Sequence, residues 1–462
     1  MKRIVIAGGG IAGLTAARAI RARDPHLDVV VLERARRPGG NIRSQRIDGY
    51  LCESGPDGFL DNAPATLALV RELGLDARLM PSSDAARRRF IFRKGRLHEV
   101  PTSPLGLART PLLSTRGKAR LVLEPFARRN QEEDESIQRF AELHIGREAA
   151  TVLVGSMVSG IFAGDAGALS LRACFPAMRR LEEKHGSLFR ALLATRGQRQ
   201  KGDAAGAPSG RLTSFEGGMT DLIDALWKNL GDAGRTNAPV LRLRKGCQND
   251  RSMNGPFTIA TPGRSLTADA VVLAGPSSES ARLVAEFDPE LSGLLSGIQS
   301  APLAVVALGY DARPFDAARL GGFGFLVPRN QGIRILGTLW ETSIYSNRAA
   351  EGKVLLRVMI GGACDPAVLG LNDEELLATV RGDLAMTMGL TAEPEFVHIV
   401  RHSRGIPQYV TGHSARLARI DDCLARHPGL HLAGNSYRSP SVNACIAEAS
   451  QIADAVFSQL TA

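Results

Sequence analysis

The fold of this chain is decided by its first strand and helix, RIVIAGGGIAGLTAARAIRAR (residues 3–23). A short β-branched run predicts a buried parallel strand, and the alanine-rich segment after it predicts a helix. Between them lies the pattern G-x-G-x-x-G, with its glycines at Gly8, Gly10 and Gly13. A second strand, DVVVLER (28–34), completes a strand–turn–helix–strand unit. Such a unit is typical of α/β domains that bind a dinucleotide.

The glycine turn predicts where the dinucleotide would bind. Gly8 permits a tight bend, Gly10 lets the backbone approach a pyrophosphate, and Gly13 lets the helix pack close to the strand. The first turn of the helix, which contains Ala12, would face the phosphates with its partial positive charge. Glu33, at the end of the second strand, would accept hydrogen bonds from both ribose hydroxyls and would repel the 2′-phosphate of NADP.

Composition bounds the class of protein. The chain has 462 residues, 44% of them hydrophobic and 23% charged, which predicts a folded protein of two or three domains. The net charge is +10, with scattered arginines and one dense cluster, RRRFIFRKGR (87–96). No basic motif with interleaved aromatic residues is present, so we expect no nucleic-acid partner.

Six cysteines occur without CxxC pairs or zinc-ligand spacing, which predicts reduced thiols, a cytoplasmic location and no metal site. The glycine-punctuated N-terminus is not typical of a signal peptide. No apolar run reaches the roughly 18–20 residues of a membrane span.

The remaining chain divides into three compositional blocks. Helix formers dominate up to about residue 200, and the polar, glycine-rich stretch 199–210 predicts an exposed linker. After residue 300, alternating apolar runs predict an antiparallel or mixed sheet. The chain closes with a strand and a helix, GLHLAGN followed by SVNACIAEASQIADAVFSQL. One domain is therefore expected to be assembled from separated segments.

A second glycine pair narrows the choice of dinucleotide. The segment RARRPGGNIRS (34–44) places Gly39 and Gly40 directly after the second strand. In this arrangement the chain resembles the FAD-dependent amine oxidase superfamily, whose extended nucleotide motif puts R-x-G-G just beyond the ribose-binding acid. The resemblance implies FAD as the cofactor.

Further strings resemble one branch of that superfamily, the oxygen-dependent protoporphyrinogen oxidases in their bacterial form. GGNIRS is followed by YLCESGPDGFL (50–60), SGIFAGDAGALSLRACFP (159–176), SFEGGMTDLIDAL (214–226), GFGFLVP (322–328) and GIPQYVTGH (405–413). The similarity spans almost the whole chain in the right order. It implies an α/β fold in which a Rossmann-type FAD-binding domain (1–85, 211–290 and 425–462) carries two further parts. These are a helical, membrane-associated domain (86–210) and an inserted mixed-sheet substrate-binding domain (291–424).

The same resemblance implies the reaction. Protoporphyrinogen IX would lose six electrons in three hydride transfers to FAD, giving protoporphyrin IX in heme biosynthesis, and O₂ would be reduced to H₂O₂. It also implies a homodimer and peripheral contact with the inner face of the cell membrane. Coproporphyrinogen III oxidation on the same fold is the first alternative, followed by an amine oxidase and a non-catalytic FAD-binding redox sensor. The two Trp and five Tyr argue against the aromatic cage of an amine oxidase.

The resemblance also implies site residues. Those expected at the porphyrinogen are Gly160, Phe323, Leu326 and Met359. Those expected at FAD are Gly8, Gly10, Ala12, Gly13, Glu33, Arg34, Gly39, Gly40, Asn41, Arg43, Gly55, Pro56, Asp57, Val240, Gly434, Ser441 and Val442.

No catalytic side chain is expected, because FAD accepts the hydride and the pyrrole nitrogens of the substrate release the protons. His144, His185, His402 and His413 are expected to be packing or surface residues. One departure concerns the substrate propionates. Relatives carry an arginine after the string LPTGL, whereas VPTSPLGLARTP here has Arg109 several residues later. The sequence leaves two sources for the basic residue that would bind a propionate: Arg109 and the 87–96 cluster.

Overall fold

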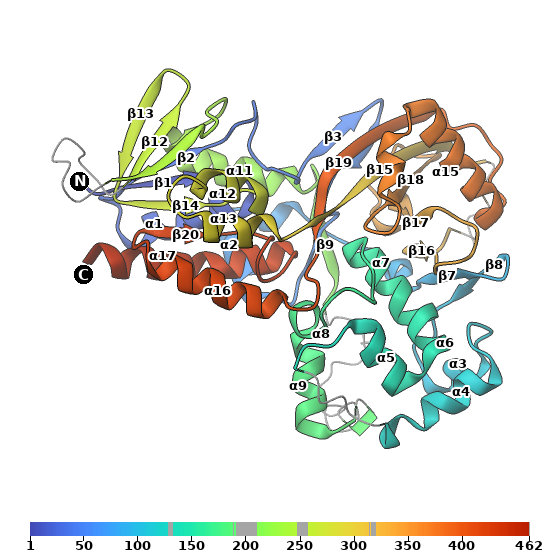
Figure 1. Cartoon of the computed structure of the whole chain (residues 1–462). Coiled ribbons are helices and arrows are strands. Elements are labelled where there is room, and N and C mark those ends of the chain that lie inside the picture. Colours follow the sequence, from blue (N-terminus) through green and yellow to red (C-terminus); the bar gives the residue numbers. More distant parts are fainter. Residues whose placement is uncertain are drawn as a thin grey trace.

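The computed structural model describes residues 1–127, 133–187, 189–190, 210–246, 257–313, 315 and 320–461. Apart from Gly210, the expected linker 199–210 lies outside these residues, as does Cys247. Figure 1 shows three lobes: one that holds both chain ends, one built on a large sheet, and one made of helices. We call them the cofactor lobe, the sheet lobe and the helical lobe.

The cofactor lobe is built on a five-stranded, all-parallel sheet. Its strands, in spatial order, are β10 (Gly234–Arg235), β2 (Asp28–Leu32), β1 (Arg3–Ala7), β14 (Ala270–Leu273) and β20 (Leu430–Leu432). The central strands are buried almost throughout, as expected for a parallel sheet covered on both faces. The sheet takes its strands from separated parts of the chain, which the opening and closing motifs predicted.

Helices cover one face of this sheet, and a mixed layer covers the other. On the first face α1 (Ile11–Arg23), α2 (Pro64–Glu72), α11 (Thr220–Leu230) and α17 (Val442–Thr461) share one apolar core. On the second lie the antiparallel strands β11 (Arg242–Lys245), β12 (Phe257–Thr261) and β13 (Arg264–Ala268), with α12 (Ser277–Val284), α13 (Pro289–Ser296) and α16 (His413–Ala425). Helix α16 thus packs on the cofactor lobe, although the sequence placed residues 413–424 in the substrate domain.

The sheet lobe contains a seven-stranded mixed sheet. Its order is β19 (Phe396–Pro407), β15 (Ser300–Asp311), β18 (Lys353–Gly361), β17 (Ile335–Trp340), β16 (Gly324–Leu326), β7 (Phe90–Arg93) and β8 (Arg96–Glu99). Helix α15 (Asp373–Met388) begins at a capping box formed by Asn372 and Glu375, and it covers one face of the sheet. Residues 90–99, which the sequence placed in the helical domain, form β7 and β8, the last two strands at one edge of this sheet.

The helical lobe consists of short helices whose starts are encoded locally. They are α3 (Pro104–Arg109), α4 (Thr115–Val122), the 3₁₀ turn η3 (Glu124–Phe126), α5 (Ile137–Ile145), α6 (Arg147–Ala149), α7 (Ser156–Phe162), α8 (Leu171–Cys174) and α9 (Pro176–His185). The hydroxyls of Ser103, Ser114, Ser136 and Ser170 accept backbone N–H groups and cap α3, α4, α5 and α8. A π-helical stretch, η4 (Ala150–Gly155), leads into α7.

Small strands connect the lobes. They are β3 (Ser44–Ile47) with β4 (Tyr50–Glu53), and β5 (Phe59–Leu60) with β9 (Leu212–Phe215) and β6 (Leu79–Pro81); the short helix α14 (Glu341–Ile344) precedes β18. In the described part of the chain, no helix combines the length and apolar character needed to cross a bilayer. The five cysteines within the described ranges are free thiols.

Candidate active site

The first glycine turn leaves no room for larger residues at two of its positions. Gly8 has a φ of +123°, and a Cβ there would lie 2.9 Å from the carbonyl carbon of Ala274 after β14. A Cβ on Gly13 would lie 2.0 Å from the backbone oxygen of Gly8. The start of α1 is therefore pressed directly onto the end of β1, as the sequence predicted.

The second glycine pair lies on the first turn. The amide of Gly39 donates to the carbonyl of Gly9 at 2.8 Å, and Gly39 and Gly40 both have positive φ values. A Cβ on Gly40 would meet only the Cα of Gly10, at 3.6 Å, and a Cβ on Gly10 would meet nothing within 4 Å. These glycines therefore border an open hollow at the carboxyl ends of the parallel strands, where α/β folds bind ligands.

The loop after β20 completes this hollow. Gly434 has a φ of +112°, and a Cβ there would lie 3.6 Å from the Cβ of Ala12. Ser441 accepts the amide of Ala444 at 3.1 Å and caps α17, which begins at Val442. Helix α1 has no side-chain cap at its N-terminus, so its first amides are available to an anion. This arrangement fits a pyrophosphate-containing cofactor.

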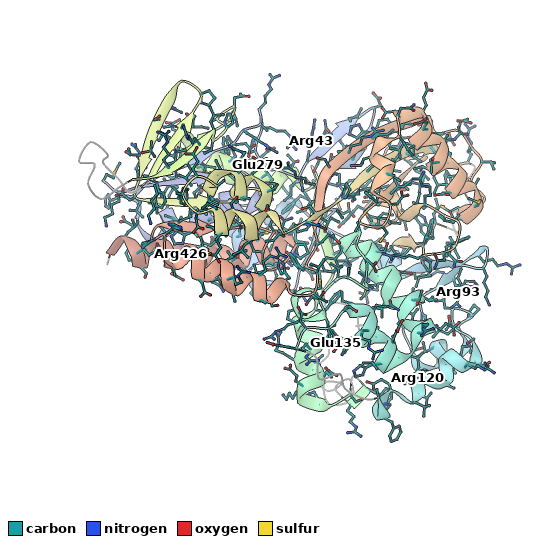
Figure 2. All side chains as sticks on the ribbon, in the orientation of Figure 1. Arg43, Arg93, Arg120, Glu135, Glu279 and Arg426 are labelled. Atoms are coloured by element: carbon teal, nitrogen blue, oxygen red, sulfur yellow. The ribbon has the colours of Figure 1, made fainter. Side chains whose placement is uncertain are left out.

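Glu33 stands beside the hollow with its carboxylate fixed. It is 8% exposed; one oxygen accepts the amide of Gly9 and the other accepts the amide of Ala35, both at 2.8 Å. Each oxygen keeps a lone pair that a ribose hydroxyl can use. Arg34, by contrast, is exposed and lies 3.6 Å from the carboxylate of Glu279 (labelled in Figure 2). The Val240 carbonyl accepts a hydrogen bond from the Arg282 guanidinium at 2.8 Å.

A pocket of about 430 Å³ continues from Glu33 toward the sheet lobe. Its lining residues are Glu33, Ala35, Arg36, Arg37, Gly40, Asn41, Arg43, Ser54, Val400 and His402. Figure 2 shows Arg43 where the cofactor lobe meets the sheet lobe. The pocket thus joins the glycine hollow to strand β19.

The segment 53–57 closes the pocket on one side. A Cβ on Gly55 would lie 2.0 Å from the carbonyl oxygen of Asn41, so this segment packs directly on the second glycine loop. Ser54 donates its amide to the carbonyl of Arg43 at 2.8 Å. Pro56 is half-buried, whereas the Asp57 carboxylate is buried and lies 3.3 Å from Arg348. The side chain of Asp57 therefore belongs to an ion cluster.

The expected substrate residues gather on the face of the large sheet that α15 leaves free. Leu326 (β16), Gly337 (β17) and Met359 (β18) are successive cross-strand neighbours; Leu326 and Met359 are half-buried and Gly337 is buried. Gly160, on α7, faces Leu326 closely, because a Cβ there would lie 2.6 Å from a Leu326 methyl carbon. The structure brings Gly160, Leu326 and Met359 together around a mainly apolar surface.

Phe323 lies at the start of β16 in a small cluster with Leu339, Ile344 and Tyr345. The guanidinium of Arg89 stands over its ring, 5.2 Å from the centroid. Desolvation by the surrounding protein lowers the pKa of this guanidinium. Among the described residues no carboxylate pairs with Arg89, whereas Arg88 is paired with Glu99 at 3.0 Å. Arg89 is therefore the arginine of the 87–96 cluster that stands over an expected substrate residue. Both Arg89 and Arg109, which lies at the end of α3, are exposed.

The histidines occupy structural positions. His144 is buried between Glu124 and Glu182, at 2.8 and 3.1 Å, and its ring packs at a tilt against the ring of Phe140. His402 and His413 each bond a backbone carbonyl, at 2.7 Å, and burial lowers the pKa of both. No group of three or more metal-ligating side chains exists within the described ranges.

Known proteins with similar sequences and structures agree with this geometry. Residues 11–457 match the family of flavin containing amine oxidoreductases. The chain is 29% identical to coproporphyrinogen III oxidase of Bacillus subtilis over 96% of each chain, and 32% identical to protoporphyrinogen oxidase of Homo sapiens over 98% of each. A crystal structure from Exiguobacterium sp. 255-15, described as a candidate protoporphyrinogen oxidase, superposes with a TM-score of 0.85 at 27% identity, covering 100% of this chain and 99% of that one. The chain therefore belongs to the family of flavin containing amine oxidoreductases and is an FAD-dependent oxidoreductase.

Proposed function

We propose that this protein oxidises protoporphyrinogen IX to protoporphyrin IX, with FAD as hydride acceptor and O₂ as the final oxidant. The observation that carries the proposal is the face of the large sheet opposite α15, which presents Leu326, Gly337 and Met359 toward Gly160. A flat apolar macrocycle needs such a surface, with glycines where a side chain would crowd the ring. The names of the relatives support the same class of substrate.

FAD supplies the two-electron chemistry when it is bound. Residues of this chain would hold it: the turns at Gly8–Gly13 and Gly39–Gly40 at the pyrophosphate, Glu33 at the ribose, and Gly434 beside α17. The segment Gly55–Asp57 would lie against its flavin end. No side chain is assigned to proton transfer, since the pyrrole nitrogens of the substrate can release protons themselves.

Arg89 supports an anionic substrate. An unpaired guanidinium beside an apolar face attracts a carboxylate and repels the ammonium group of an amine substrate. We assign Arg89 to a propionate of the porphyrinogen. This argues against an amine oxidase and does not by itself separate protoporphyrinogen, with two propionates, from coproporphyrinogen, with four.

The helical lobe supports peripheral membrane contact. Val122 and Phe126, at the end of α4 and in η3, are 76% and 80% exposed, and Leu105 on α3 is 61% exposed. Arg116 and Lys118 lie on the same helix α4, so apolar and basic side chains occur together, as at an interface with anionic lipid. A homodimer and a location on the inner membrane face stay predictions.

The test compares two substrates. The purified yellow holoenzyme is given protoporphyrinogen IX or coproporphyrinogen III in air, and porphyrin fluorescence and H₂O₂ are recorded together. We expect about one H₂O₂ for each two-electron step and faster turnover of protoporphyrinogen. Preference for coproporphyrinogen would establish the alternative, and no rate above autoxidation with either would refute the proposal. Co-sedimentation with anionic vesicles, with F126S as the variant, tests membrane contact.

A further inference from the structure

Five buried ionisable side chains join the cofactor lobe to the sheet lobe. Glu53 and Asp57 belong to the segment that packs on the glycine loop, whereas Glu341, Arg348 and Arg357 belong to α14, the loop after it and β18. We call these five residues the ion cluster. Each is at most 9% exposed. Burying a charge costs folding free energy unless the charge is paired. A buried cluster at this position therefore suggests a function for these side chains.

The two arginines divide the contacts between them. Arg348 lies 3.3 Å from Glu53 and from Asp57 and 3.6 Å from Glu341, and it donates to the Ser214 hydroxyl at 3.1 Å. Arg357 lies 3.5 Å from Glu341 and 3.8 Å from Asp57, and it also donates to the backbone carbonyl of Gly55. Arg357 is therefore bonded directly to the main chain of the segment expected at the flavin.

The position of Arg357 on β18 connects both ends of the site. It lies two residues before Met359 on the same strand face, and it pairs across the sheet with Leu339. His402 of β19 makes a parallel tie, because its ring bonds the Ser54 carbonyl at 2.7 Å. Two side chains of the large sheet, Arg357 and His402, thus bond the segment 54–57.

We propose that Arg357 is a positioning residue that holds the Gly55–Asp57 segment at a fixed distance from the substrate face. Through this segment it would also position the flavin. Arg348 holds the same segment through Asp57. Its guanidinium bonds the Gly55 carbonyl, and Gly55 packs on the Asn41 carbonyl beside the second glycine pair. The proposal rests on FAD as the cofactor and is independent of which porphyrinogen is the substrate.

The experiment uses the holoenzyme and reads the flavin directly. R357M should release FAD about tenfold faster than the wild type and should change the visible circular dichroism of the bound flavin, because a hydrogen bond to a charged donor is lost. R357K keeps one donor and should stay within about threefold. R334M removes a guanidinium that pairs with Asp365 just before β17 of the same sheet, outside the ion cluster, so it should leave both signals unchanged.

A second variant separates tethering from charge balance. R357M/E341Q removes the arginine together with one opposing carboxyl group, which protects folding if R357M alone is too unstable to isolate. We expect the double variant to recover thermal stability while FAD release stays fast. Two results would overturn the proposal. One is a double variant that releases FAD at the wild-type rate. The other is an R357M enzyme that releases FAD within twofold of the wild-type rate and shows unchanged circular dichroism. Neither readout requires porphyrinogen turnover, so a wrong substrate assignment would not affect the result.

Discussion

The cofactor hollow and the substrate face are built from different parts of the polypeptide. The hollow is bordered by backbone turns at Gly10, Gly40 and Gly434, where an added Cβ would meet open space or, at most, atoms at 3.6 Å and beyond. The substrate face is formed by side chains of separate strands, such as Leu326 and Met359, which face Gly160 on a helix of another lobe. The cofactor hollow depends on the path of the backbone, whereas the substrate face depends on which side chains come together. They should therefore respond differently to mutation.

The largest expected effect on the cofactor hollow comes from adding one methyl group to the first glycine turn. Gly13→Ala would place a Cβ 2.0 Å from the Gly8 carbonyl oxygen, and backbone cannot move away as a side-chain end can. We expect a loss of about 3 kcal/mol in stability and no FAD binding. Thermal unfolding of the apoprotein and FAD titration check this.

Gly10→Ala is the matched control. Its φ of −76° suits alanine and its Cβ would meet no protein atom, so the apoprotein should lose at most about 1 kcal/mol, the usual cost of alanine at an N-cap. The methyl group would nevertheless project into the hollow and weaken FAD binding. If Gly13→Ala binds FAD normally, the turn does not fix the helix as described.

Arg89→Ala should affect the substrate end alone. Removing the unpaired guanidinium over Phe323 should raise KM for the porphyrinogen about tenfold, with kcat nearly unchanged and the flavin spectrum intact. Steady-state kinetics at two ionic strengths measure the effect, because high salt screens a charge contact. Arg88→Ala is the control, since Arg88 is already paired with Glu99. Equal KM values for the two variants would contradict the assignment.

Gly160→Ala should have a smaller effect because its contact is a flexible side-chain end. The new Cβ would lie 2.6 Å from a Leu326 methyl carbon, which can change rotamer. We expect a stability loss of about 1 kcal/mol and a KM increase of a few-fold as Leu326 moves into the substrate space. The double variant Gly160→Ala/Leu326→Ala should recover part of the KM. A single variant with wild-type KM would place the macrocycle elsewhere.

The same contrast explains how far the sequence could predict the molecule. The turn at Gly8–Gly13, the acid Glu33 and the pair Gly39–Gly40 were identified because they depend on local backbone geometry. The Rossmann-type sheet and the mixed sheet followed from apolar runs in the same way. The resemblance placed residues 90–99 in the helical domain, whereas β7 pairs with β16, far along the chain, and β8 pairs with β7.

The ion cluster could not be predicted. Arg357 meets Gly55 across 302 residues and Arg348 meets Asp57 across 291, and neither arginine differs locally from the many arginines of this basic chain. Arg89 had a visible signal, its place in the 87–96 cluster, but only the fold shows that its guanidinium stands over the Phe323 ring. Contacts of this kind depend on tertiary pairing, which composition and periodicity do not encode.

The smallest expected effect concerns the pH dependence of the ion cluster. Burial and the neighbouring Asp57 raise the pKa of Glu341 from 4.5 to about 8, while Arg357 and Arg348 lower it. Glu53, whose pKa burial also raises, Cys52 and Tyr345 face the same cluster. Two guanidinium groups therefore oppose three carboxyl groups, and the folded protein retains a proton that the unfolded chain releases. Stability contributed by this group falls as pH rises from about 4.5 to about 8 and is constant above that.

Glu341→Gln should remove this dependence. The variant should match the wild type near pH 5 and gain about 1 kcal/mol over it by pH 8, because the remaining two carboxylates balance the two arginines. Thermal unfolding from pH 5 to pH 9 measures the difference. Glu395→Gln is the control: hydrogen bonds from Lys353 and Tyr50 lower the pKa of Glu395, so its contribution to stability is complete above about pH 4.5 and is lost only at lower pH. This variant should therefore lie below the wild type by a constant amount from pH 5 to pH 9. A Glu341→Gln curve parallel to the wild type would show that the cluster is balanced by a counter-charge other than a retained proton.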